Sequence, residues 1–200
     1  MGSTESATDL PGGRDAALEL LHEYTKKPGL IKHALAVEAA CRTYAEKHGA
    51  DPDAWGLVGL LHDFDYERWP TPEDHPFRGS EILAERGYPE WFRRAILSHA
   101  NYSGVARESL LEKTLFACDE LSGFLTACAL VTPARSLHDV KVKSVRKKMK
   151  SKAFAASVSR EDIIDGAEGL GVDLNEHIEF VLGALRGVAD ELELGGQGAP

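Results

Sequence analysis

The residues of this chain with the clearest chemical potential are histidines and aspartates at six positions. His62 and Asp63 are adjacent and end an apolar run that starts at Trp55. Imidazole and carboxylate are both good ligands for a divalent metal, and neither favours burial unless another group holds it. The other four residues, each in or beside a helix-like segment, are His33, His75, His99 and Asp119. Together the six indicate a metal site assembled from several helices.

Taken singly, each of these residues also has an ordinary structural interpretation. A histidine on a helix face is commonly packed or solvated, and an isolated aspartate often caps a helix. Asp119, however, lies in an apolar segment, and no basic residue occurs between Lys113 and Arg135. Burying an ionised carboxylate costs several kcal/mol unless a cation or strong donors meet it. The joint pattern therefore favours metal ligation.

The elements that must position these ligands are predicted to be helices throughout. Apolar residues recur at three- and four-residue steps, and no convincing run alternates in the manner of a strand. Helices are expected over residues 14–25, 30–48, 52–63, 76–86, 89–99 and 107–130, with two more starting near Ser159 and Asp173. In the second of these, His33 shares the apolar face with Leu30 and Val37. We predict an all-α fold: one helical domain over 14–194, with flexible tails over 1–13 and 195–200.

The order and contexts of the ligands resemble the HD-domain superfamily of metal-dependent phosphohydrolases. The resemblance is carried by His33, the His62-Asp63 doublet and Asp119, and the stretches 57–63 and 75–83 are particularly similar to the group called HDIG. It implies an all-helical bundle in which His33, His62, Asp63 and Asp119 bind one metal. His75 and His99 match the positions that hold a second metal, and Asp63 would bridge the two ions.

Two departures from the family pattern affect the expected chemistry. Several two-metal members carry paired histidines where this chain has His99-Ala100, and many carry a lysine soon after the doublet, where this chain reads Phe64-Asp-Tyr-Glu-Arg68. Mixed histidine and carboxylate ligation suits iron, manganese, cobalt or nickel, with magnesium or zinc as alternatives. The predicted cofactor is therefore one or two divalent metal ions, of a kind the sequence leaves open.

Residues outside the ligand set are candidates for catalysis and substrate binding. Asp63 is the predicted catalytic ligand, and Asp65 is predicted to act as a base or as a partner of a metal ligand. Arg68 is a candidate substrate contact, as is Tyr66. The segment Lys141–Lys150 contains six basic residues and no acidic one, and from it Arg146 and Lys147 are candidate phosphate contacts. The alternative for this segment is a solvated helix face.

Composition limits the remaining classes of function. The net charge of −9 argues against general nucleic-acid binding, and the 190 residues outside 141–150 carry −15. No apolar run reaches membrane-spanning length and no secretory signal is recognised, so we expect a cytoplasmic protein without a membrane partner. The three cysteines show no paired spacing and are expected to be reduced core thiols. The oligomeric state stays open.

The leading hypothesis is a metal-dependent phosphatase or phosphodiesterase acting on a small phosphorylated molecule, with nucleotides among the candidates. A bound ion lowers the pKa of water and supplies hydroxide near neutral pH. The runner-up is a diiron oxygenase, because the superfamily contains such members with the same six ligands and the usual lysine is absent here. A non-catalytic metal-binding signalling module is the third alternative.

Overall fold

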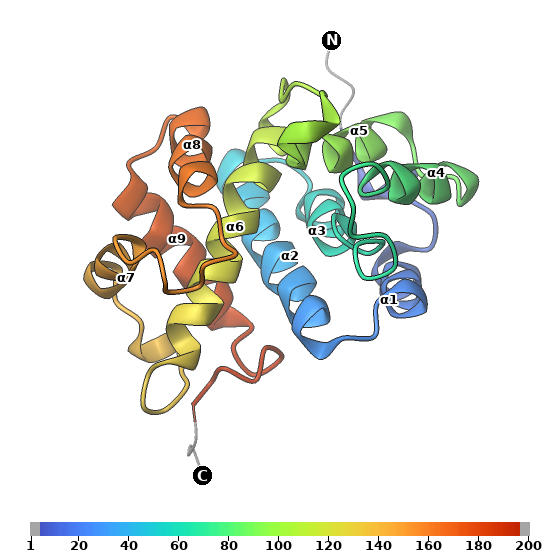
Figure 1. The fold of residues 1–200 in the computed structure, drawn as a ribbon. Helices are drawn as coiled ribbons and strands as arrows, with labels where there is room; N and C mark the ends of the chain where they lie inside the picture. Colours follow the sequence, from blue (N-terminus) through green and yellow to red (C-terminus); the bar gives the residue numbers. More distant parts are fainter. Residues whose placement is uncertain (1–4, 197–200) are drawn as a thin grey trace.

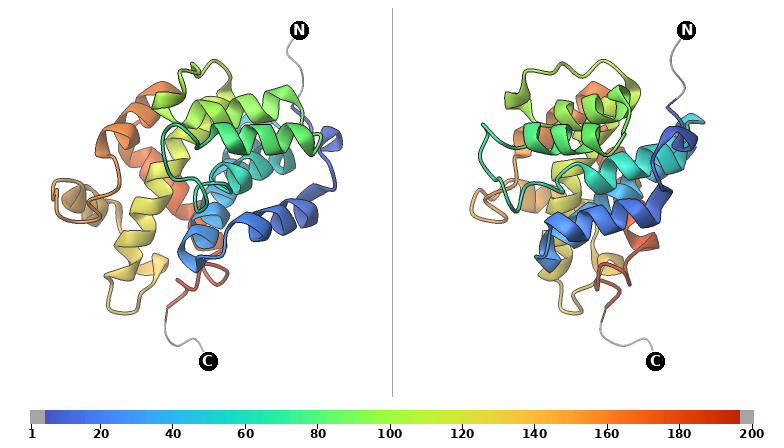
Figure 2. Two further views of the ribbon diagram at one scale, coloured as in Figure 1. Left: turned by 45° about the vertical axis from the view of Figure 1, so that its right-hand side comes forward. Right: turned by 90° about the vertical axis from the view of Figure 1, so that its right-hand side faces the viewer.

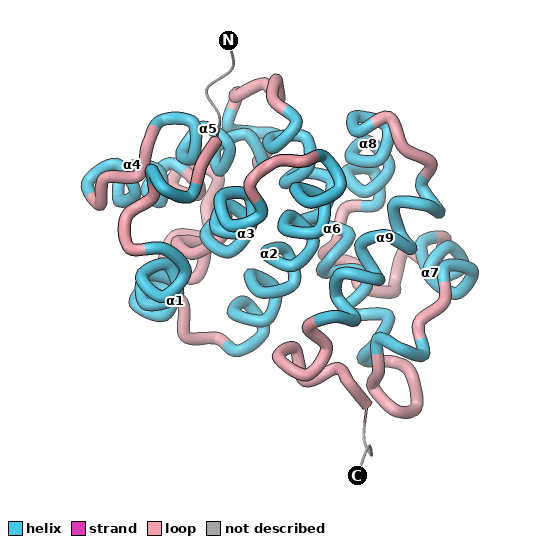
Figure 3. The backbone as a smooth tube through the Cα atoms, turned by 180° about the vertical axis from the view of Figure 1, so that it is seen from behind, coloured by secondary structure: helices cyan, strands magenta, loops and turns pink. Residues whose placement is uncertain are grey.

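A computed structural model describes residues 5–196, and over that range the chain is a set of α-helices joined by loops, with no strand (Figures 1 and 3). The helices are α1 (Gly13–Tyr24), α2 (Pro28–His48), α3 (Pro52–Leu61), α4 (Phe77–Glu85), α5 (Glu90–His99), α6 (Leu110–Leu130), α7 (Val142–Met149), α8 (Arg160–Leu170) and α9 (Leu174–Gly187). The predicted all-α class is confirmed. No helix in the described range is long and apolar enough to cross a membrane.

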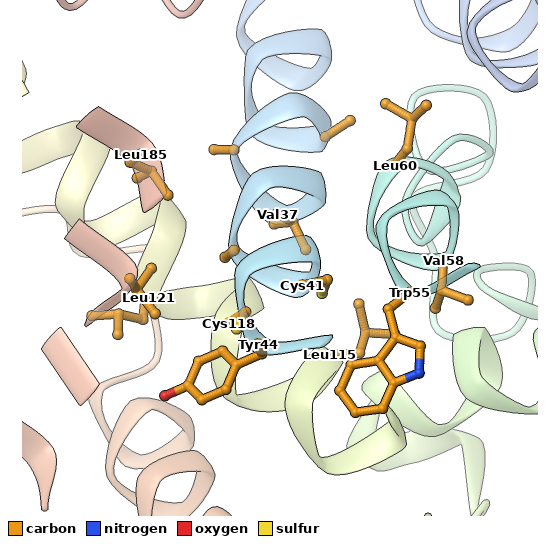
Figure 4. Packing of buried hydrophobic residues seen from close by; sticks show 14 of the residues in the cluster. Val37, Cys41, Tyr44, Trp55, Val58, Leu60, Leu115, Cys118, Leu121 and Leu185 are labelled. Carbon is orange, nitrogen blue, oxygen red and sulfur yellow. The ribbon is translucent and has the colours of Figure 1, made fainter. Parts of the chain in front are cut away.

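The two longest helices, α2 and α6, pack against each other at the centre of the molecule. In Figure 1, α1, α3, α4 and α5 lie on one side of this pair and α7, α8 and α9 on the other. Figure 4 shows the core between them, where Val37 and Cys41 of α2 meet Leu115 and Cys118 of α6. All three cysteines are buried free thiols. The ligand-bearing helices α2, α3 and α6 are therefore held by a shared apolar core.

Helices α2 and α3 approach closely because α3 presents Gly59 to α2. A Cβ at Gly59 would lie 2.8 Å from the carbonyl oxygen of Val37 and 3.0 Å from the amide nitrogen of Glu38. Both are backbone atoms that cannot rotate away, so any side chain here must push the helices apart. The close approach also fixes the end of α3, where His62 and Asp63 follow.

We therefore expect Gly59→Ala to destabilise the protein by about 1–3 kcal/mol through overpacking. Urea unfolding followed by circular dichroism measures this as a lower midpoint. The control is Gly183→Ala in α9, where an added Cβ meets no atom within 4 Å. That variant should be as stable as the parent or slightly more so, since it removes a helix-interior glycine. Equal midpoints for Gly59→Ala and the parent protein would contradict the prediction.

Several helix boundaries differ from the sequence-based prediction for identifiable reasons. Helix α2 starts at Pro28 and not at residue 30, because a proline in the first turn has no N–H that needs a partner within the helix. Helix α6 starts at Leu110 and not at 107, because Ser109 and Glu112 form a reciprocal capping box. Ser159 and Asp173 cap α8 and α9 as expected. The side chain of Ser159 accepts a hydrogen bond from Asp162 N, and that of Asp173 accepts from Asn175 N and Glu176 N.

The ends of the predicted domain also differ in detail. Residues 1–4 and 197–200, parts of the two expected tails, lie outside the described residues. Within the expected N-terminal tail, Ala7 N donates to Asp51 at 2.8 Å and Trp55 Nε1 donates to Glu5 at 2.9 Å. Leu194 is buried, and its carbonyl accepts from Leu137 N at 2.9 Å. Residues 5–12 and 194 are thus attached to the helical body.

Candidate metal centre

The first group of potential ligands joins three helices. His33 comes from α2, His62 directly follows α3, and Asp119 comes from α6. His33 Nε2 lies 3.0 Å from Asp119 Oδ1, and His62 Nε2 lies 3.4 Å from the same oxygen. One ligand atom from each residue falls within 4.8 Å of the others, a spacing at which a single ion could contact all three. Residues 86 positions apart in the chain thus meet because α2 and α6 pack together.

The second group lies beside the first and consists of Asp63, His75 and His99. Asp63 Oδ1 is 3.1 Å from His75 Nε2 and 3.3 Å from His99 Nε2, and the two imidazole nitrogens are 3.3 Å apart. This group also has the spacing that would suit one ion. His75 comes from the loop between α3 and α4, which Figure 2 shows as an irregular segment, and His99 is the last residue of α5.

Asp63 faces both groups through its two carboxylate oxygens. While Oδ1 contacts the second group, Oδ2 lies 3.5 Å from His62 Nε2 in the first. A carboxylate placed in this way can donate one oxygen to each of two ions. The bridging role of Asp63 stays a prediction, and these two distances are compatible with it.

Hydrogen bonds at Nδ1 direct the histidine Nε2 atoms toward the site. His62 Nδ1 donates to the Gly59 carbonyl at 2.7 Å, His99 Nδ1 donates to the Ile96 carbonyl at 2.5 Å, and His75 Nδ1 lies 2.8 Å from Asp65 Oδ1. An imidazole that donates from one nitrogen keeps its lone pair on the other for a metal. Nε2 of the fully buried His62 forms no hydrogen bond within the described residues. A cation at this position would satisfy that nitrogen, so the donor set fits a divalent metal.

Asp65 supports the second group from behind and does not line the pocket. It is fully buried; Oδ1 takes the His75 hydrogen bond and Oδ2 accepts from Gly79 N at 2.9 Å. With both oxygens occupied, Asp65 is placed to orient His75, which was one of its two predicted roles. A base acting on substrate would need to reach the pocket, and this carboxylate is turned away from it.

We expect Asp65→Asn to weaken binding of the second metal about 10–100-fold, because an amide cannot accept from both His75 and Gly79. Calorimetric titration of metal-free protein with Mn²⁺ measures this affinity. Asp74→Asn is the matched control, since Asp74 lies in the same loop but bonds to Arg78 at 2.7 Å on the surface. If both variants bind Mn²⁺ as the parent does, Asp65 has no positioning role.

The buried acids and imidazoles strongly shift one another's ionisation. Burial lowers the pKa of His62, but the carboxylates of Asp63 and Asp119 outweigh this and raise that pKa to about 10. Burial acts in the same direction on His75, whose hydrogen bonds to carboxylates outweigh it and raise its pKa to about 9. For Asp63 and Asp119, burial raises the pKa, yet the neighbouring imidazoles hold it well below its usual range. Without metal, the site therefore retains protons that a metal must displace.

A pocket of about 400 Å³ opens over the two ligand groups. Five of the six ligands line it, and His62 is buried beneath them. The outer wall adds Tyr66, Asn101, Tyr102, Glu120, Ser157 and Asp162. Burial, followed by the charge of Asp119, raises the pKa of Glu120 to about 7. The pocket thus combines a ligand floor with a polar rim.

The basic residues predicted to bind substrate are not among those that line this pocket. Arg68 lies over the Tyr24 ring at 4.1 Å and donates to the Glu23 carbonyl at 2.5 Å. Arg146 and Lys147 lie on α7, where Val145 packs into the core and the charged side chains project outward. This placement agrees with the alternative of a solvated helix face for the segment.

Glu120, Asn101, Ser157 and Asp162 line the pocket but were not identified from the sequence. Glu120 could have been noticed because it follows Asp119 directly in the chain. Asp162 lies three residues after Ser159, at the predicted start of a helix. Ser157 and Asn101 carry no local pattern, since their place in the pocket depends on how loops dock across α6.

Comparison with protein families agrees with this geometry. The family model described as HD domain matches residues 30–123, a range that contains all six ligand candidates. No curated protein and no solved structure matches the chain. The residues Ser157 and Asp162 of the pocket lie beyond the matched range. Residues 30–123, which contain both ligand groups, are thus similar in sequence to the HD domain.

Proposed function

We propose that this protein is a metal-dependent phosphohydrolase that acts on a small phosphorylated molecule. The observation that carries the proposal is the pair of ligand groups joined by Asp63, at the floor of a pocket large enough for a small substrate. The match of residues 30–123 to the HD domain, a family mostly of metal-dependent hydrolases, supports it. Both phosphatase and phosphodiesterase activities fit this site.

A divalent ion bound by these ligands would supply Lewis acidity and lower the pKa of the attacking water. The residues of the chain would fix the geometry of the reaction. His33, His62 and Asp119 would hold one position and Asp63, His75 and His99 the other, with Asp65 keeping the His75 ring in place. Tyr66, Asn101 and Ser157 line the pocket and can hydrogen-bond to the phosphoryl oxygens or to the leaving group.

The burial of the ligands supports the same proposal. His62, His75 and His99 are at most 8% exposed, so their imidazoles are shielded from competition by bulk water. Electrostatic stabilisation of a phosphoryl group is stronger in such a site than in solution. Substrate would enter from the rim and leave its phosphoryl group at the floor.

A diiron oxygenase is the second candidate function. The complete second ligand group favours it, together with the finding that no lysine or arginine among the described residues lines the pocket. A phosphoryl-transfer site commonly uses such a cation to stabilise charge, whereas an oxygenase does not need one. The two functions differ in their co-substrate, which makes them separable by experiment.

The test is turnover of a panel of phosphate monoesters and diesters by protein loaded with Mn²⁺ or Fe²⁺, with and without oxygen. Oxygen-independent release of phosphate or of a monoester from at least one compound is the expected result. Oxygen consumption that depends on iron, without phosphate release, would favour the oxygenase. If verified metal-loaded protein shows neither activity, the non-catalytic signalling module becomes the better account.

A further inference from the structure

Two acidic side chains lie at the rim of the pocket. Glu120 of α6 and Asp162 of α8 line it in addition to the ligand carboxylates, while none of its described lining residues is a lysine or arginine. The carboxylates beneath the pocket also act on Tyr102 of the rim. Burial first, and then the carboxylates Asp63 and Asp65, raise its pKa to about 12.

Two arginines in segments next to the pocket, Arg107 and Arg160, do not line it. Arg107 lies 3.7 Å over the Phe116 ring, donates to the Ser98 carbonyl at 2.8 Å and to Asn101 Oδ1 at 2.9 Å, and interacts with the charge of Asp162. Arg160 donates to the carbonyls of Ala155 and Val158 at 2.5 Å each and lies over the Phe124 ring. Both guanidinium groups are thus held by contacts within the protein.

The N-terminus of α8, a feature that could attract an anion, is partly occupied by side chains of the protein. The connection from α7 to α8 crosses α6 (Figure 1), and there Ser159 N donates to Glu120 Oε2 at 3.0 Å. Asp162 N is capped by Ser159 Oγ at 3.1 Å. These contacts satisfy two of the N–H groups at the helix start, the region where a phosphate or carboxylate could otherwise bind. The carboxylate of Glu120 therefore competes there with a second anionic group of a substrate.

Two aromatic rings complete the rim. Tyr66 and Tyr102 line the pocket and are 39% and 51% exposed, so their faces are accessible to a ligand. Tyrosine faces attract ammonium groups, as carboxylates do. Asn101 Nδ2 donates to Asp162 Oδ1 at 3.0 Å, and Tyr102 is the next residue after Asn101.

We infer that the substrate is a phosphomonoester whose alcohol carries an ammonium group, with Glu120 and Asp162 as the residues that select it. This inference rests on the proposed hydrolase function and narrows its substrate class. Water adds to phosphorus and the bond from phosphorus to the alcohol oxygen breaks, giving inorganic phosphate and an amino alcohol. The phosphoryl group lies at the metal ligands, and the ammonium group lies at the rim. Nucleotides with further phosphates are disfavoured, because their extra charge would meet these carboxylates.

The experiment compares esters of equal length that differ only in their terminal group. Mn²⁺-loaded protein is assayed with phosphoethanolamine, phosphocholine, 2-hydroxyethyl phosphate and phosphoglycolate. We expect kcat/KM to be about tenfold higher for an ammonium ester than for the neutral one, a ratio that one partly screened charge pair supports. The anionic ester should be the poorest substrate.

Asp162→Asn and Glu120→Gln remove the charge but keep an oxygen that can accept from Asn101 and Ser159. Each should reduce the ratio between ammonium and neutral esters at least threefold, mainly through KM. Glu161→Gln is the control, since Glu161 is an exposed neighbour on α8 that does not line the pocket. It should leave the ratio unchanged.

Calorimetric binding of the same esters separates the two possible failures. If esters are hydrolysed with no preference for the ammonium group, the hydrolase proposal stands and the selectivity inference is overturned. If no ester is hydrolysed, the proposed function fails, and the relative affinities of phosphocholine and 2-hydroxyethyl phosphate still decide the selectivity. Equal affinities in the parent protein overturn it; a preference that Asp162→Asn abolishes upholds it.

Discussion

Replacing Asp63 by alanine is expected to reduce phosphate release at least about 10³-fold, the loss that corresponds to roughly 4 kcal/mol of transition-state stabilisation. Asp63 is the residue whose two carboxylate oxygens face the two ligand groups, at 3.1 Å from His75 and 3.5 Å from His62. Without it each group loses a contact, and the second retains only two imidazoles. The second metal should therefore be lost as well as the activity.

The measurement combines kcat/KM on the best ester with metal content after dialysis. The parent should retain up to two ions per chain and Asp63→Ala no more than one. Asp63→Asn, which keeps the side-chain volume, guards against a folding artefact and should show the same loss. The control is Asp53→Asn, whose exposed carboxylate bonds to Arg42 at 2.6 Å. A variant at Asp63 that keeps a tenth or more of the parent activity would show that hydrolysis does not depend on this centre.

The ligand set was predictable from the sequence because local rules apply to it. An ionisable residue on an apolar helix face must find a partner, and His33 and Asp119 both lie in such segments of α2 and α6. Helix spacing and caps predicted these elements to within a few residues. The family resemblance implied one metal held by His33, His62, Asp63 and Asp119 and a second by His75 and His99, and the structure groups Asp63 with the latter two. The assignment of these residues as metal ligands stays a prediction.

The rim of the pocket could not be predicted, because it depends on long-range docking. The placement of Asp162 requires α8 to lie against α6, which is secured by contacts such as Ser159 with Glu120 across 39 residues of sequence. Arg68 illustrates the converse. Its position near the doublet suggested a substrate contact, but the Tyr24 ring and the Glu23 carbonyl offer it a partner on the outside of the loop. Sequence spacing gives the face of an element, not the direction of that face in the fold.

The affinity of the site for metal is expected to rise steeply with pH between about 6 and 9. His62 and His75 have pKa values raised to about 10 and about 9, so each holds a proton over this range in the metal-free protein. A metal must displace that proton, and each displacement contributes about tenfold in affinity per pH unit. Between pH 6 and 8 the affinity for Mn²⁺ should therefore increase by about 100-fold for each site.

The stability of the metal-free protein should follow the opposite trend. A histidine with a raised pKa stabilises the fold fully below its unfolded pKa of 6.5, and this contribution is lost as pH rises toward 9 and 10. The lowered pKa values of Asp63 and Asp119 give a contribution that is present above their ordinary value of 3.8 and lost only in stronger acid. The protonated site is thus most stabilising between about pH 4 and 6.5.

Thermal unfolding of chelator-treated and Mn²⁺-loaded protein tests both trends together. The difference in Tm should widen from pH 6 to pH 9, because the metal binds more tightly while the metal-free protein loses stability. His62→Asn should flatten this dependence, whereas His138→Asn, at an exposed histidine outside the site, should leave it as in the parent. A Tm difference that stays constant between pH 6 and pH 9 would mean that His62 and His75 carry no extra proton in the metal-free protein. The pKa values of these histidines would then not be raised, which contradicts the prediction.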